Sequence, residues 1–137
     1  MNTRRAALKS LAFAAASLCA GQAFAGSYLN RAALLISEGR KEADYLRQHF
    51  ADKELARIVH RLATARVEVA SAMMVPKEVV QAHPHLLLIF ENNERAADAA
   101  ENAQAERFLV CQQRALDEER TFRFVLKQLG WEIPASA

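Results

Sequence analysis

Residues 26–50 read GSYLNRAALLISEGRKEADYLRQHF, and they decide the expected fold class. Within them, one set of mostly apolar residues recurs at alternating spacings of three and four: Leu29, Ala32, Ile36, Gly39, Ala43, Leu46 and Phe50. This heptad spacing places the set on one side of a helix, which must pack against other helices. We predict a helix over residues 27–50.

Three more helices are predicted downstream, over residues 53–74, 77–101 and 103–129. No glycine occurs between Gly39 and Gly130, and strong helix formers dominate. The predicted core stripes are Leu55, Ile58 or Val59, Leu62, Ala65, Val69 and Met73; then Val79, His83, Leu86, Phe90, Asn93, Ala97 and Ala100; then Phe108, Cys111, Ala115, Glu118, Phe122, Val125 and Leu129. The second of these stripes passes through Pro84, so we expect one helix kinked there.

The ends of the helices carry further signals. Asp52 is a suitable N-cap, while Gly130 followed by Trp131 suits a Schellman motif. The heptad stripe slips by one position between Ala100 and Phe108, and this slip indicates a turn near residues 101–103. The alternative is one long helix from 84 to 129, which would present a surface for dimerisation. The sequence thus predicts an all-α, up-down antiparallel four-helix bundle over residues 26–132, with a frayed tail at 133–137.

The first 25 residues have the parts of a signal peptide. Arg4 and Arg5 are basic, residues 11–20 are apolar, and Ala23 and Ala25 form an A-x-A cleavage site. The apolar run is about half the ~20 residues of a membrane span, so we expect no permanent span. We predict removal of residues 1–25 and a periplasmic or secreted bacterial protein.

Residues 3–9, TRRAALK, resemble the twin-arginine export signal. That resemblance implies export of an already folded protein, whereas a general secretory signal with paired arginines is the alternative. Because three of the 18 basic residues lie in the leader and all 16 acidic residues follow it, the processed chain has 15 basic and 16 acidic residues. Its net charge of −1 argues against a nucleic-acid partner.

Two groups of polar residues are candidate sites. Arg66, Asn93 and Glu118 fall near the middle of their helices, and they form either a ligand site in the core or a buried polar layer that fixes helix register. The other Arg, Glu and Gln residues between Gln112 and Arg123 of the last helix are expected to form a solvated face.

The other group, Met73, Met74, His83 and His85, is predicted near one end of the bundle. Thioether and imidazole together suit copper, particularly Cu(I), so these residues are a candidate copper site. The alternative is that Met73 and His83 are ordinary core residues.

No complete catalytic or cofactor motif occurs. Cys111 is the only cysteine after the leader, and we expect its thiol to be buried. The Cys-x-x-Cys-His motif for covalent haem attachment is missing from the sequence. We therefore expect a non-enzymatic exported protein without a cofactor, which acts by binding another protein or a second copy of itself. The alternative is a periplasmic copper or small-ligand binding or sensor protein.

Overall fold

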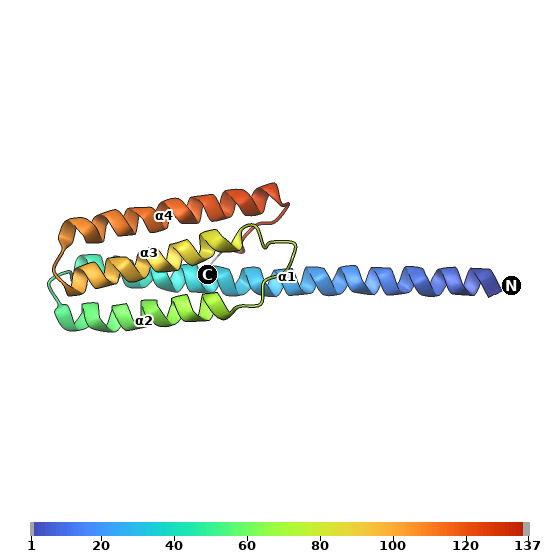
Figure 1. Cartoon of the computed structure of the whole chain (residues 1–137), viewed down its shortest axis with the longest axis horizontal. Coiled ribbons are helices and arrows are strands. Elements are labelled where there is room, and N and C mark those ends of the chain that lie inside the picture. Colours follow the sequence, from blue (N-terminus) through green and yellow to red (C-terminus); the bar gives the residue numbers. More distant parts are fainter. Residues whose placement is uncertain (1, 136–137) are drawn as a thin grey trace.

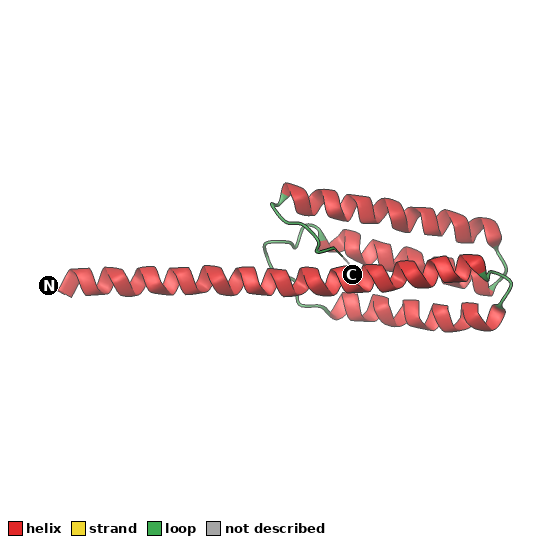
Figure 2. Cartoon of the chain, turned by 180° about the vertical axis from the view of Figure 1, so that it is seen from behind, coloured by secondary structure: helices red, strands yellow, loops and turns green. Residues whose placement is uncertain are grey.

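The computed structural model describes the backbone of residues 2–135 and the side chains of residues 21–135. It contains four helices, and no strand occurs in this part of the chain: α1 (Asn2–Gln48), α2 (Lys53–Ala72), α3 (His83–Glu101) and α4 (Ala105–Gln128). Consecutive helices contact one another, and the chain reverses direction at each connection (Figure 1). The all-α, four-helix prediction is confirmed, as the red helices and green loops of Figure 2 show.

Helix α1 is longer than the others, and its N-terminal half extends beyond them (Figure 1). It continues without a break through the predicted cleavage point after Ala25. Ala23 is exposed, and Ala25 is the first buried apolar residue among those with described side chains. The predicted signal residues Arg4 and Arg5 precede the part of α1 whose side chains are described. In the described part of the chain, no helix combines the length and apolar character needed to cross a membrane.

Helix α3 occupies the centre of the arrangement. It packs closely along α2 and α4 and also contacts α1, whereas α1 and α4 approach each other closely at few points. Its second half is rich in small buried residues: Ala96, Ala97, Ala99 and Ala100. Small side chains let neighbouring helices come close, so this half of α3 can pack tightly against its neighbours.

The predicted helix ends at Asp52 and Gly130 are confirmed. The Asp52 carboxylate accepts a hydrogen bond of 3.0 Å from the Leu55 backbone N–H. Gly130 has a φ of +85°, and the Trp131 N–H donates to the Leu126 carbonyl at 2.9 Å, as a Schellman motif requires. The tail then returns to the core, because Ile133 packs against it; residues 136 and 137 of the predicted frayed tail lie outside the described residues.

The turn between α3 and α4 has the same geometry without a glycine. Ala103 has a φ of +55°, and the Gln104 N–H donates to the Ala99 carbonyl at 2.8 Å. The predicted turn at residues 101–103 is therefore confirmed, and the alternative of one helix from 84 to 129 is wrong. An alanine in the left-handed region costs about 1–2 kcal/mol.

The predicted kink at Pro84 is wrong. Residues 77–82 form successive turns, and α3 begins at His83, with Pro84 in its first turn. Proline lacks an N–H, and the first turn of a helix is where that group has no helical partner. Val79, the first residue of the predicted stripe, is buried even though it lies in a turn, so its burial does not require a helix before Pro84.

The predicted stripe of α2 is displaced by one position. Buried on α2 are Ala56, Val59, Ala63, Arg66 and Ala70. The larger residues Ile58, Leu62 and Val69 are 51%, 46% and 53% exposed. The small residues face inward because α2 packs against the alanine-rich half of α3, where bulky side chains would hold the helices apart.

Candidate functional site

Two of the three predicted polar-layer residues come together around Gly39. A methyl group at Gly39 would lie 3.1 Å from the Asn93 amide nitrogen and 3.4 Å from an Arg66 guanidinium nitrogen. Glycine thus lets these polar groups approach the α1 backbone. Arg66 is buried and forms an ion pair with Glu42 of α1, a partner that the sequence did not indicate.

The third predicted residue, Glu118, lies elsewhere. It is half-buried and pairs with His85 at 2.9 Å between Oε2 and Nδ1. The buried carboxylate of α4 is instead Glu119, whose Oε2 lies 2.6 Å from Arg40 Nη2 and 3.4 Å from Arg123 Nε. Glu119 and the buried Gln112 also correct the expectation that residues 112–123 are a solvated face.

His83 is held by hydrogen bonds within the core. The Tyr28 hydroxyl lies 2.8 Å from His83 Nδ1, and the ring also donates to the Ala70 backbone carbonyl. Burial lowers the pKa of His83 below its ordinary value, and the Ala70 hydrogen bond opposes this shift. Burial also raises the pKa of the Tyr28 hydroxyl. At neutral pH the Tyr28 hydroxyl therefore donates to a neutral imidazole.

The four residues proposed for copper have separate environments. His83 contacts Tyr28, His85 contacts Glu118, Met73 packs against the core, and Met74 is 77% exposed. Among the described residues, no three His, Cys, Asp or Glu side chains are grouped so as to hold a metal ion. Copper binding here stays a prediction from the sequence. Cys111 is buried and free, as expected.

An apolar strip lies on the surface of α2. It consists of Ile58, Leu62, Ala65 and Val69, which are all exposed and spaced as one helix face, and we call it the α2 apolar face. Leu62 and Val69 lie one turn on either side of Arg66, which reaches Glu42 of α1. The strip therefore borders α1. Glu54, Arg61 and Glu68 flank its other edge and are exposed.

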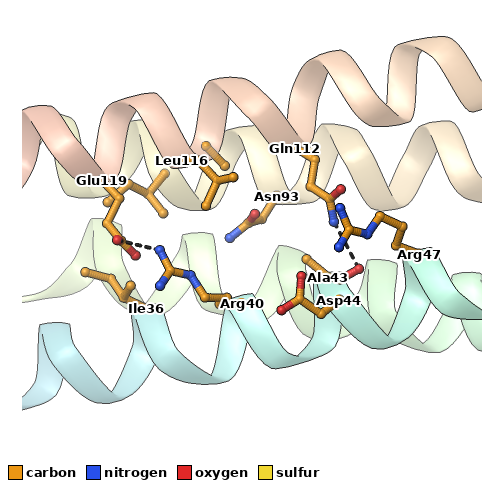
Figure 3. A pocket seen from close by; sticks show the side chains of 11 residues that line it. Ile36, Arg40, Ala43, Asp44, Arg47, Asn93, Gln112, Leu116 and Glu119 are labelled. Atoms are coloured by element: carbon orange, nitrogen blue, oxygen red, sulfur yellow. Dashed lines mark hydrogen bonds and ion pairs between the residues drawn. The ribbon is translucent and has the colours of Figure 1, made fainter. Parts of the chain in front are cut away.

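A hollow of about 220 Å³ lies between α1 and α4 and is also lined by α3. We call it the α1–α4 groove. Its lining residues are Ile36, Arg40, Ala43, Asp44 and Arg47 of α1, Ile89 and Asn93 of α3, and Gln112, Ala115, Leu116 and Glu119 of α4 (Figure 3). It combines an apolar floor with charged and amide groups, as small-molecule sites do.

No family model, curated protein or solved structure matches this chain.

Proposed function

We propose that this is an exported, non-enzymatic protein that works outside the cytoplasm by self-association. In this proposal residues 1–25 are removed, and residues 26–132 act as an up-down antiparallel four-helix bundle. Just beyond the proposed cleavage point, Tyr28 and Leu29 are buried in the core, which supports a folded unit that begins close to Gly26. The observation that carries the proposed association is the α2 apolar face.

A helix face with this composition needs a partner. Ile58, Leu62 and Val69, which are spaced four and seven residues apart, are exposed to solvent on α2. The buried face of α2 consists instead of three alanines with Val59 and Arg66. Each large apolar side chain contributes about 1.5–3 kcal/mol when it is fully removed from water. The spacing is that of a helix pair, so another helix fits the face.

Charge pattern favours a second copy of α2, in antiparallel orientation. Placing Leu62 opposite Ala65 of the second copy also places Ile58 opposite its Val69, and two-fold symmetry repeats both contacts. In antiparallel pairs, the same flank of each helix meets. In this arrangement Arg61 and Glu68 of the second copy differ by only two residues in height, which is about 3 Å along the helix axis. The symmetric dimer gains this opposite-charge contact twice.

The expected dimer is weak. Helix α2 has 20 residues, which span about 30 Å, so one helix pair buries less than a standard interface of ~800 Å² per partner. We expect a dissociation constant on the order of micromolar, because the free energy gained by burying so small an area is largely offset by the entropy lost on association.

The test is analytical ultracentrifugation of the protein, expressed with its leader and purified from the compartment where it accumulates. We expect mass spectrometry to find a chain starting at Gly26, and sedimentation to show a monomer–dimer equilibrium. Leu62→Glu should abolish the dimer without unfolding the protein, since Leu62 is already half exposed. The matched control is Leu109→Glu on α4, where a leucine is 53% exposed, and it should still dimerise.

The charge contact is tested separately. Arg61→Glu should weaken the dimer by about tenfold or less, as expected of an exposed pair, and adding Glu68→Arg should restore it. A monomer at all concentrations, or equal loss in the two leucine variants, would refute association through this face. A chain that keeps its leader and stays cytoplasmic would refute export.

A further inference from the structure

The α1–α4 groove is fixed at both ends by contacts between helices. At one end Arg40 of α1 pairs with Glu119 of α4 at 2.6 Å, and at the other the Gln112 amide donates to the Ala43 backbone carbonyl at 3.1 Å. Asn93 of α3 lies between these two contacts (Figure 3). These two contacts join α1 to α4, and the open space of the groove lies along them.

Three polar groups at this space have no partner within residues 21–135. Asn93 makes no side-chain hydrogen bond there, and its amide points into the groove (Figure 3). Asp44 and Arg47 are exposed and form no ion pair with each other or with any described side chain. The Arg40 and Glu119 charges, by contrast, already neutralise each other. The groove therefore offers one unpaired negative and one unpaired positive group.

The floor of the groove is apolar. Ile36, Ile89 and Leu116 line it together with two alanines, and Ile89 is buried. Its volume of about 220 Å³ exceeds the ~150 Å³ of an apolar cavity that accommodates benzene. That space suits a small organic molecule with a branched aliphatic part.

We propose that the α1–α4 groove binds an apolar α-amino acid such as leucine. The carboxylate of the ligand pairs with Arg47 and accepts a hydrogen bond from the Asn93 amide, and its ammonium group pairs with Asp44. The aliphatic side chain lies against Ile36, Ile89 and Leu116. This function is independent of the α2 apolar face, because none of its residues lines the groove.

Each lining group has a separate chemical role. Arginine binds a carboxylate through two parallel N–H donors, so Arg47 sets the direction of the ligand. Asp44 rejects simple carboxylates that lack an ammonium group, because two negative groups would then come together. The floor selects branched aliphatic side chains over polar ones by the apolar area that they bury.

The test is isothermal titration of the purified protein with L-leucine, and with two analogues that each lack one charged group. These are 4-methylpentanoate, without the ammonium, and 3-methylbutylamine, without the carboxylate. We expect leucine to bind with a dissociation constant below about 1 mM, and both analogues to bind at least about tenfold more weakly. Amide chemical shifts should change at residues 40–47 and 112–119 when leucine is added.

Variants identify the groups responsible. Arg47→Gln and Asp44→Asn should each weaken leucine binding by about tenfold or more, since each removes a charge-assisted contact. Arg31→Gln is the matched control: Arg31 is another exposed arginine of α1, it lines none of the described hollows, and its loss should leave binding unchanged. Circular dichroism confirms that each variant is folded.

Three results would overturn the proposal. The first is no leucine binding at about 10 mM. The second is 4-methylpentanoate binding as tightly as leucine. The third is an equal effect of Arg31→Gln and Arg47→Gln. None of these bears on dimerisation, so the two proposals fail separately.

Discussion

The buried ion pair between Arg66 and Glu42 makes an asymmetric prediction about stability. The Arg66 side chain is 7% exposed and that of Glu42 is 22% exposed. Glu42→Gln removes the negative charge and leaves the guanidinium in the core without a charged partner. Arg66→Met removes the buried charge itself and leaves a carboxylate that water can reach.

The two changes should therefore differ in size. Breaking a fully buried pair by removing one partner costs about 3–5 kcal/mol. Because Glu42 is about one-fifth exposed, water compensates part of this loss, and we expect Glu42→Gln to cost about 2–3 kcal/mol. Replacing a buried charge by an apolar side chain of similar length is often neutral, so Arg66→Met should change stability by less than about 1 kcal/mol.

The assay is urea unfolding followed by circular dichroism, with the free energy extrapolated to water. Equal m-values among the variants show that they expose the same surface on unfolding. Glu38→Gln is the matched control, because Glu38 forms an exposed pair with Lys41 at 3.3 Å that is worth about 0–1 kcal/mol. The reasoning is wrong if Arg66→Met destabilises the protein more than Glu42→Gln, or if Glu42→Gln matches the control.

Three further predictions concern the core, the α3–α4 turn and pH. Phe122→Ala should destabilise by about 3–5 kcal/mol because Phe122 is fully buried, whereas Leu62→Ala should cost under about 1 kcal/mol in the monomer; similar losses in urea unfolding would contradict the observed face of α2. Ala103→Gly should raise the free energy of unfolding by about 0.5–1 kcal/mol, since glycine adopts positive φ without strain but loses more entropy on folding; a lower melting temperature would count against this. Because the pKa of His83 is lowered in the folded state, the unfolded chain binds more protons just below the ordinary histidine pKa, and stability should rise with pH through that range. His83→Gln should flatten this slope and His49→Gln, at an exposed position, should not; thermal melts at several pH values would show equal slopes if the argument fails.

Local signals in the sequence predicted the elements well. Asp52, Gly130 and Trp131 marked helix ends because capping depends on neighbouring residues alone. The phase slip before Phe108 indicated the α3–α4 turn although Ala103 is not a glycine. The apolar spacing around Pro84 is the same whether the proline starts a helix or kinks one. The sequence pattern therefore could not distinguish these two structures.

The faces of the helices were harder to predict. Periodicity weights bulky apolar residues, so it selected Leu62 and Val69 over the alanines that close packing against α3 requires. It likewise selected Glu118 over Glu119, one position away. The α1–α4 groove had no signal in the sequence, because it depends on how far apart two helices settle after α3 is in place.

The central position of α3 has a consequence for the order of assembly. Most contacts join helices that follow one another along the chain through short connections, and folds rich in such local contacts form in microseconds to milliseconds. Pairing α1 with α3 is different, because it closes a loop that contains all of α2. We expect the last three helices to gather first, and α1, whose N-terminal part is the proposed leader, to dock onto them last.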